Sequence, residues 1–314
     1  MKTERLKDDP AGIARAAALL AQGQTVAMPT ETVYGLAADA RNGPAVARIY
    51  AAKGRPSFNP LIVHVPDLAA AQGLAMFSDD ARRLAAAFWP GALTLVLPLR
   101  DGAGVASLVT SGLDTVGLRV PAHPAAQALL RAFGGPVAAP SANASGRISP
   151  TTAAHVLDPD GGLDTRIAAV LDAGACGVGV ESTIIGWNQG RAVLLRPGGI
   201  AAEDVAAVLG YDLTRHDGDP VAPNAPGQLT SHYAPKATLR LNAVPRAGET
   251  FIAFGEPGDF TLSATGNLTE AAARLFDTLR RADRMGRPIS VAPIPNHGLG
   301  AAINDRLRRA AAPR

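Results

Sequence analysis

Two cations, Lys53 and Arg55, stand on either side of a single glycine and just before a proline. In an extended loop, both side chains can turn to one polyanion. A phosphate suits this pair, because an ammonium is a compact point charge and a guanidinium is a planar fork of donors. The alternative is a solvated helix end, where cations complement the helix dipole. Taken alone, the pair slightly favours this alternative.

Three further segments place polar residues beside apolar runs. Thr30 lies in the stretch 29–36, which could orient a small polar ligand or form a capped turn. Arg119 interrupts the apolar run 116–120, where it is either exposed or grips a carboxylate in a cleft. Residues 140–150 are rich in serine, and their backbone amides could form an anion site next to a helix start, or simply a turn.

Alternating strand and helix patterns must position these loops. They predict an α/β domain over about the first two hundred residues, because ligand-binding loops of open α/β sheets follow the strand ends. The stretch 211–236 is rich in proline and glycine and predicts a linker. We expect three parts, 1–208, 209–236 and 237–314. The predicted strands are 25–28, 61–65, 93–97, 116–120, 137–139, 167–171, 182–185, 192–195, 239–243, 251–254 and 289–292, and the main predicted helices are 11–21, 44–53, 124–133, 268–285 and 300–311.

Composition excludes several classes of protein. Cys176 is the only cysteine in 314 residues, which excludes an intrachain disulfide and a cysteine-rich zinc site. A net charge of +3 is too small for an obligate nucleic-acid coat. We expect a cytoplasmic protein that does not enter membranes, since the sequence has neither a long apolar stretch nor a secretory signal. The common phosphate-binding glycine motifs are also absent.

A set of motifs, in order along the first two hundred residues, resembles the YrdC-type threonylcarbamoyl-AMP synthases. No single motif is decisive, but the combination is highly specific. The motif S-H-Y-A-P-K and the additional C-terminal unit are similar to the long, two-domain form of this enzyme. The motifs are P-T-E-T-V-Y-G-L, K-x-R-P-x-x-N-P-L-I-V-H, W-P-G-x-L-T, R-x-P-x-H-P, A-P-S-A-N-x-S-G, E-S-T-I-I and L-L-R-P-G.

The resemblance implies a twisted, mostly parallel sheet with helices on both sides and a concave cleft, followed by a smaller Rossmann-like domain. It implies an enzyme that joins L-threonine, bicarbonate and ATP into threonylcarbamoyl-AMP and pyrophosphate. Mg²⁺ would arrive with ATP, without dedicated protein ligands. A separate transferase complex would then modify the adenosine beside the anticodon of tRNA.

The resemblance also implies roles for particular residues of this chain. Lys53 and Arg55 would neutralise the ATP phosphates as the catalytic pair. Tyr233, from the linker, would close over the nucleotide. The further ATP-binding residues would be Asn59, Thr110, Ser141, Asn143, Ser149 and Arg196, and the L-threonine site would consist of Thr30, His64, Arg119 and Ser182.

Two other functions compete with this interpretation. YrdC-like domains occur in hydrogenase-maturation proteins that make carbamoyl-adenylate from carbamoyl phosphate, but those proteins carry cysteine-rich zinc fingers. A nucleic-acid-binding module is the other alternative, because the sequence is basic and a direct contact with tRNA or another RNA is conceivable. The cations of interest, however, follow strands and do not line one helix.

Overall fold

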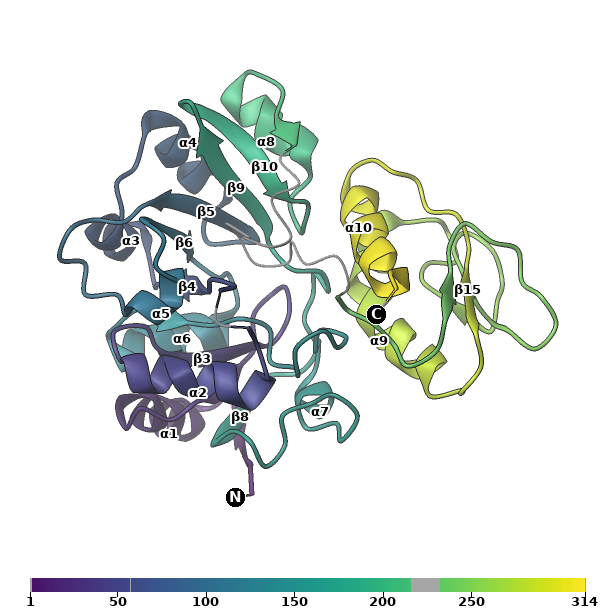
Figure 1. The fold of residues 1–314 in the computed structure, drawn as a ribbon, viewed down its shortest axis with the longest axis horizontal. Coiled ribbons are helices and arrows are strands. Elements are labelled where there is room, and N and C mark those ends of the chain that lie inside the picture. The colour runs from purple at the N-terminus through teal and green to yellow at the C-terminus, as the bar shows by residue number, and fades with distance from the viewer. Residues whose placement is uncertain (1, 57, 216–231, 314) are drawn as a thin grey trace.

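The computed structural model describes residues 2–56, 58–215 and 232–313. Figure 1 shows a larger body, made by the N-terminal two thirds of the chain, beside a smaller C-terminal unit. Helices α9 (Leu268–Asp283) and α10 (Leu299–Ala311) lie on the side of the smaller unit that faces the larger body. The smaller unit therefore packs against the larger body through these two helices.

An 11-stranded sheet forms the centre of the larger body within the described part of the chain. Its order is β1-β8-β2-β3-β7-β4-β6-β5-β9-β10-β11. The strands are β1 (Glu4–Lys7), β2 (Val26–Met28), β3 (Gly35–Asp39), β4 (Ile62–His64), β5 (Leu93–Pro98), β6 (Thr115–Arg119), β7 (Val137–Ala138), β8 (Ala169–Asp172), β9 (Thr183–Asn188), β10 (Arg191–Arg196) and β11 (Thr214–Arg215).

The predicted α/β class is confirmed, but the expectation of a mostly parallel sheet is wrong. Five of the ten neighbouring pairs that the described strands form are antiparallel. Strand β3 has no counterpart among the predicted strands, and it turns back on β2 directly after the polar loop 29–34. Two of these pairs, β2 with β3 and β9 with β10, arise because a short loop returns the chain in the opposite direction.

Local signals begin and end the helices around the site. Asn42 caps α2 (Gly43–Lys53) by accepting a hydrogen bond from the backbone of Ala45, and a proline occupies the first turn. Gly54 ends this helix at a φ of 59°, a left-handed conformation that favours glycine. The remaining helices of the larger body are α1 (Pro10–Ala21), α3 (Leu68–Leu74), α4 (Asp79–Phe88), α5 (Ser107–Thr110), α6 (Pro124–Phe133), α7 (Ala153–Val156) and α8 (Ala202–Leu209).

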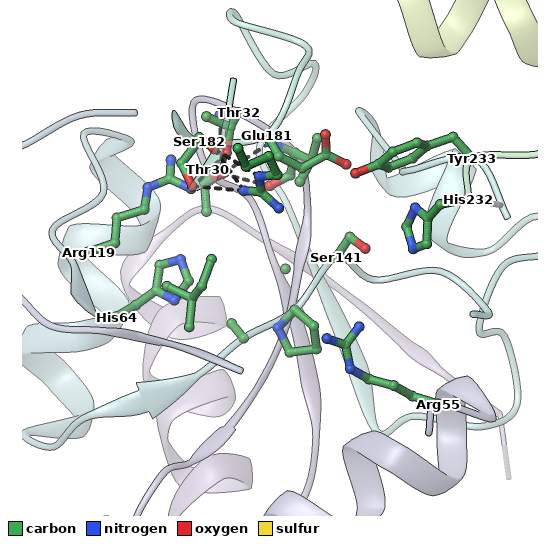
Figure 2. A pocket seen from close by; sticks show the side chains of 16 residues that line it. Thr30, Thr32, Arg55, His64, Arg119, Ser141, Glu181, Ser182, His232 and Tyr233 are labelled. Atoms are coloured by element: carbon green, nitrogen blue, oxygen red, sulfur yellow. Dashed lines mark hydrogen bonds between the residues drawn. The ribbon is translucent and has the colours of Figure 1, made fainter. Parts of the chain in front are cut away.

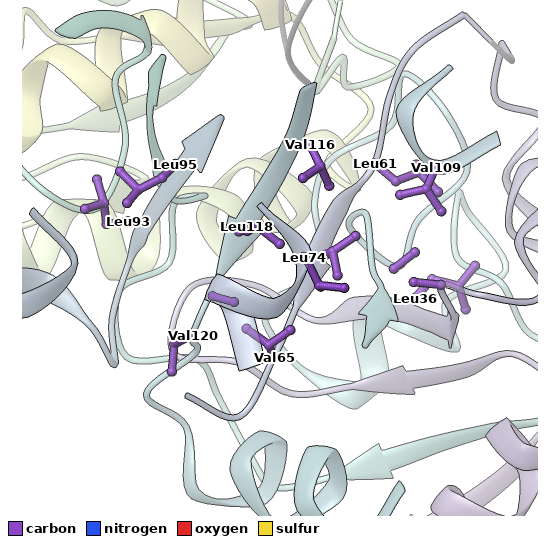
Figure 3. Packing of buried hydrophobic residues seen from close by; sticks show 14 of the residues in the cluster. Leu36, Leu61, Val65, Leu74, Leu93, Leu95, Val109, Val116, Leu118 and Val120 are labelled. Atoms are coloured by element: carbon purple, nitrogen blue, oxygen red, sulfur yellow. The ribbon is translucent and has the colours of Figure 1, made fainter. Parts of the chain in front are cut away.

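The main apolar core lies between the sheet and its helices. Figure 3 shows Leu93 and Leu95 of β5 near Leu118 and Val116 of β6, all of them buried. Because alternate strand residues point to opposite faces, this packing fixes the register of the sheet. The polar residues that follow these strands are thereby held in place.

The smaller unit has its own four-stranded sheet, in which the three pairings among the described strands are parallel. Helices α9 and α10 contribute most of its core. This confirms the smaller C-terminal α/β unit. Its strands are β12 (Leu239–Arg240), β13 (Thr250–Ala253), β14 (Phe260–Thr261) and β15 (Ile289–Val291).

The predicted linker, 209–236, begins as part of the large sheet, because β11 pairs with β10. Residues 216–231 of this linker lie outside the described residues. The chain is described again from His232, and the domain boundaries themselves stay a prediction. Among the residues described, no helix combines the length and the apolar character needed to cross a bilayer.

Candidate active site

A cavity of about 580 Å³, including its open mouth, lies where several strands of the large sheet end. Figure 2 shows Arg119 and His64 at one end of it and Arg55, His232 and Tyr233 at the other. Its lining includes eight predicted site residues, namely Thr30, Arg55, His64, Arg119, Ser141, Ser182, Arg196 and Tyr233.

Arg119 ends strand β6 and is held in one orientation. It donates from Nη2 to Glu31 Oε1 at 2.6 Å and from Nη1 to Thr32 Oγ1 at 2.9 Å. It is 4% exposed. Burial alone would raise the pKa of Glu31, but the charge of Arg119 holds it below its usual value. The guanidinium is thus a fixed cation with a carboxylate already beside it.

Thr30 and His64 line the same end of the cavity. The Thr30 hydroxyl lies 2.9 Å from that of Thr32 and donates to the Val33 carbonyl at 2.6 Å. Burial, and then the nearby charge of Arg119, lowers the pKa of His64 to about 3. The imidazole is therefore neutral at physiological pH. It can hydrogen-bond a ligand without adding a charge.

Ser182 and Arg196 form a second polar group. The Ser182 hydroxyl lies 2.7 Å from Thr94 Oγ1. Arg196, at the end of β10, donates from Nη2 to the Ser182 carbonyl at 2.8 Å and to the Ser182 hydroxyl at 3.2 Å. Burial lowers the pKa of Arg196 to about 10, so this side chain stays cationic at neutral pH.

Lys53 does not line the cavity but lies behind one of its loops. Its ammonium donates to the backbone carbonyls of Ser141 and Asn143, both at 2.6 Å. Burial, and then the neighbouring Arg55, holds the pKa of Lys53 well below its usual value. The strain of this buried charge would be relieved by an anion in reach. Lys53 is the last residue of α2, but the alternative of a solvated helix end is wrong, because this side chain is 3% exposed.

Arg55 does reach the cavity, from the opposite side to Arg119 (Figure 2). Its Nε donates a hydrogen bond to the Asn59 carbonyl at 3.2 Å, and its Nη2 donates one to the Pro60 carbonyl at 3.0 Å. Burial lowers its pKa to about 10. Lys53 thus lies behind the loop 141–143, whereas Arg55 faces the cavity itself.

Four other predicted ATP-binding residues do not line this cavity. Asn143 donates from Nδ2 to the carbonyls of Ala144 and Arg147, at 2.8 and 2.9 Å, and shapes its own loop. Asn59 is buried near Arg55. Ser149 donates to Glu181 at 2.5 Å. Thr110 lines a separate depression with Leu61 and Val116.

Two titratable residues of the cavity lining, Glu181 and His232, were not among the predicted site residues. Burial alone would raise the pKa of Glu181, but Arg306 and Arg196 hold it below its usual value. Burial lowers the pKa of His232 to about 3. The only sequence signals were their motifs, E-S-T-I-I and S-H-Y-A-P-K. The partner of Glu181 is 125 residues away, beyond any local pattern.

Tyr233 is buried between this cavity and the smaller unit. Its ring stacks on Phe276 of α9 at a centroid distance of 5.4 Å and meets the His232 ring edge-on at 4.1 Å. Its φ of 61° is unusual for a residue other than glycine. The contacts with Phe276 and His232 maintain this backbone conformation. The conformation directs the phenol of Tyr233 to the cavity wall near Glu181 (Figure 2).

Together these side chains make a site for an anionic ligand with a polar pocket beside it. Cations at both ends and hydroxyls between them match phosphate and carboxylate oxygens. Over the described ranges, no group of three or more histidine, cysteine, aspartate or glutamate residues is placed to hold a metal ion. The protein supplies charge and donors, without a cage of carboxylates.

Comparisons with known proteins agree with this arrangement. A family described as "Telomere recombination" matches residues 18–198, and one described as "Threonylcarbamoyl-AMP synthase, C-terminal domain" matches residues 200–312. The threonylcarbamoyl-AMP synthase of Bacillus subtilis is 42% identical over 337 residues, which covers 98% of this chain and 95% of that protein.

Two solved structures are similar over nearly the whole chain. The crystal structure of Pyrococcus abyssi Sua5 complexed with L-threonine is 36% identical, with a TM-score of 0.88, and the match covers 99% of this chain and 98% of that one. A P. abyssi Sua5 variant, with a histidine and the following tyrosine both replaced by alanine, gives the same identity and TM-score over 98% and 96%. The chain therefore belongs to the threonylcarbamoyl-AMP synthase family.

Proposed function

We propose that this cavity joins L-threonine, bicarbonate and ATP into threonylcarbamoyl-AMP, with release of pyrophosphate. The observation that carries the proposal is the convergence of Arg55, Arg119 and Arg196 on one cavity at the strand ends. Membership of the family supports it, since the B. subtilis relative is named for this product. L-threonine bound to P. abyssi Sua5 supports the amino-acid substrate.

The triphosphate would occupy the end of the cavity near the loop 140–143. Arg55 and Arg196 line that space, and Lys53 supplies a third cation behind the loop. An ammonium has three donors, and two of them bind carbonyls here, so one remains for a phosphate oxygen. Ser141, Asn143 and Ser149 would shape the loop. Asn59 and Thr110, which are buried outside the cavity lining, stay predicted ATP contacts.

Threonine would lie at the other end, against Arg119. Its carboxylate would share this guanidinium with Glu31, and its hydroxyl would reach Thr30, Ser182 or the neutral His64. Tyr233 and His232 would cover the nucleotide from the side of the linker. This arrangement would bring the threonine amine near the α-phosphate.

The chemistry needs two steps. The threonine amine attacks bicarbonate, a C–N bond forms, and water leaves to give a carbamate. A carbamate oxygen then attacks the α-phosphorus in line, the bond between the α-phosphorus and its bridging oxygen breaks, and pyrophosphate leaves with that oxygen. Positioning and neutralisation of charge are the main contributions that a protein makes to such transfers. Lys53, Arg55 and Arg196 would neutralise the pyrophosphate, and no covalent intermediate with the protein is required.

Mg²⁺ would enter as part of the MgATP substrate. Mg²⁺ usually keeps several waters and binds through one or two carboxylates together with substrate phosphates. Among the described residues that line the cavity, Glu181 is the one carboxylate, and it already accepts hydrogen bonds from Ser149 and Arg306 on its two oxygens. The metal would therefore be held mainly by the phosphates.

Isotope-labelled bicarbonate tests the product directly. The protein is incubated with ATP, L-threonine and ¹³C-bicarbonate, and the nucleotide products are separated by mass spectrometry. We expect an adenylate whose mass includes threonine and one ¹³C. A nucleotide product without label, or the same product without threonine, would contradict the proposal.

Carbamoyl phosphate in place of threonine and bicarbonate separates this activity from carbamoyl-adenylate formation. We expect no product from it. The product would pass to a separate threonylcarbamoyl transferase complex that modifies tRNA, and a direct contact of this chain with tRNA stays a prediction.

A further inference from the structure

The side chain of Arg306, on helix α10 of the smaller unit, reaches the wall of the candidate site. This residue is fully buried, with a relative exposure of 0%. Its Nε donates to Glu181 Oε2 at 2.8 Å, and Glu181 lines the cavity. A cavity residue of one unit thus has its counter-charge in the other.

Further contacts of the Arg306 guanidinium hold it in this place. Nη1 of Arg306 donates to the Pro197 carbonyl at 2.8 Å and to Asp305 at 2.9 Å. Its guanidinium lies 5.5 Å from the centre of the Tyr233 ring. At the start of the same helix, the backbone of Gly298 donates to Glu203 of α8 at 3.2 Å. The helix is therefore tied to the larger body at its start and again at Arg306.

Glu181 is a buried carboxylate in a cavity that would have to accept a triphosphate. The charged and titratable groups around it are Arg306 and Asp305 from α10, Arg196 from β10, Lys53 from α2, and His232 and Tyr233. An unpaired carboxylate here would repel the phosphates strongly, because charges interact across a low dielectric. Of these groups, Arg306 makes the direct ion pair with it.

We propose that Arg306 is a positioning residue, which neutralises Glu181 from the smaller unit and thereby makes the cavity able to bind ATP. The proposal rests on the assignment of this cavity as the ATP site. It gives the smaller unit a defined task, since ATP affinity becomes coupled to its docking. The coupling is reciprocal, so bound ATP would also strengthen the docking of α10.

The test compares ATP dissociation constants, measured by isothermal titration calorimetry on the full-length chain. We expect Arg306→Met to weaken ATP binding by about tenfold or more, as for an uncompensated like charge near the ligand. Adding Glu181→Gln to this variant removes the charge that repels ATP, so the double variant should recover most of the affinity. Arg306→Lys, which keeps the charge, should lose less than Arg306→Met.

Two control variants separate this role from a general loosening of the interface. Arg308→Met changes an exposed arginine of the same helix and should leave ATP affinity unchanged. Arg280→Met removes another buried arginine between the units, one that pairs with Asp158 and not with Glu181. It should weaken ATP binding less than Arg306→Met does, and Glu181→Gln should not restore that loss.

The pH dependence gives a further readout. In Arg306→Met, Glu181 loses the partner that keeps its pKa low, so it titrates at higher pH. ATP affinity should then fall more steeply with rising pH than in the wild type, because the ionised Glu181 carboxylate would repel the phosphates. Glu181→Gln should remove this additional slope.

Two results would overturn the inference. One is equal ATP affinity of Arg306→Met and the wild type. The other is a loss that Glu181→Gln does not restore and that Arg280→Met reproduces in full, since Arg306 would then act only through docking. A wild-type protein that does not bind ATP at all would instead contradict the proposed function, so the two failures are distinguishable.

Discussion

The Lys53 side chain both holds a loop of the site in place and brings a buried amine close to it. Its ammonium bonds two carbonyls of the loop 141–143, and its charge is buried without a carboxylate in direct contact among the described residues. A buried ammonium with a lowered pKa gains stability when a polyanion approaches. This gives the residue a physical reason to favour the phosphates of ATP.

We therefore expect Lys53→Met to lower the rate of pyrophosphate release by about 10²–10³-fold, the effect of removing one preorganised donor. Steady-state kinetics with saturating threonine would measure it. Lys7→Met is the matched control, because Lys7 is an exposed lysine on β1, and it should keep normal activity. A nearly normal rate in Lys53→Met would show that its charge does not act in the reaction.

Arg119 offers a separate prediction for threonine. Replacing it with methionine removes the fixed guanidinium and leaves Glu31 without its cation. We expect the KM for threonine to rise by about 10²-fold or more, because a lost charge-assisted pair costs about 2–5 kcal/mol. The KM for ATP should change much less. An unchanged KM for threonine would place the amino acid elsewhere.

The sequence predicted the cavity cations better than it predicted their surroundings. Arg119 and Arg196 could be found because each ends an apolar strand pattern. The pairing of Arg119 with Glu31 joins residues 88 positions apart, and that of Glu181 with Arg306 joins residues 125 apart. Nothing local marks such pairs, so Glu181 was missed. The position of Lys53 behind the loop 141–143 was not foreseen either, because its carbonyl partners are about 90 residues away.

At the scale of elements, strands β4 and β6 bring His64 and Arg119 together. The two strands are parallel, and their register places these residues side by side. The arginine and burial together keep the imidazole neutral, with its pKa lowered to about 3. The pairing that brings these two residues together therefore also makes folding sensitive to acid.

Folding stability should fall as the pH is lowered below about 6.5, the usual pKa of histidine. In the window between about 3 and 6.5 the unfolded chain binds a proton at His64 that the folded protein excludes, so stability rises with pH there. Protonation of His64 in the unfolded chain lowers the free energy of unfolding by about 2 kcal/mol at pH 5 relative to pH 7. Urea unfolding at both pH values should show a smaller pH effect in His64→Gln than in the wild type. An equal effect in the two proteins would mean that His64 is protonated in the fold.

Most helices and strands could be predicted from the sequence, but the order and the direction of the strands in the sheet could not. The helix 124–133 was predicted with its observed bounds, because Pro124 begins it and Gly134 ends it. Strand β3 was missed, since it follows a polar loop without a turn signal of its own. The insertion of β8 between β1 and β2, and the antiparallel pairs, depend on contacts across the whole chain.

At the scale of the whole molecule, ion pairs join the two units beside the Tyr233 contact. Asp158 of the larger body is buried between Arg280 and Arg284 of the smaller unit, at 3.6 and 2.6 Å. Asp160 also pairs with Lys236, at 2.6 Å, but both of these side chains are well exposed. The two aspartates therefore provide a matched comparison.

We expect Asp158→Asn to destabilise the docking of α9 and α10 by about 3–5 kcal/mol, because it leaves the buried Arg280 unpaired. Asp160→Asn should change it by less than about 1 kcal/mol, as is usual for exposed pairs. Hydrogen–deuterium exchange of α9 and α10 would report both effects. Equal exchange in the two variants would show that the buried pair does not hold the units together.

The central claim is that the cavity couples threonine to the cleavage of ATP. Its most direct test is pyrophosphate release by the full-length protein with MgATP and bicarbonate, in the presence and absence of L-threonine. We predict pyrophosphate release that depends on both threonine and bicarbonate and is lost in Lys53→Met. Release at the same rate without threonine, or none when all substrates are present, would contradict this function.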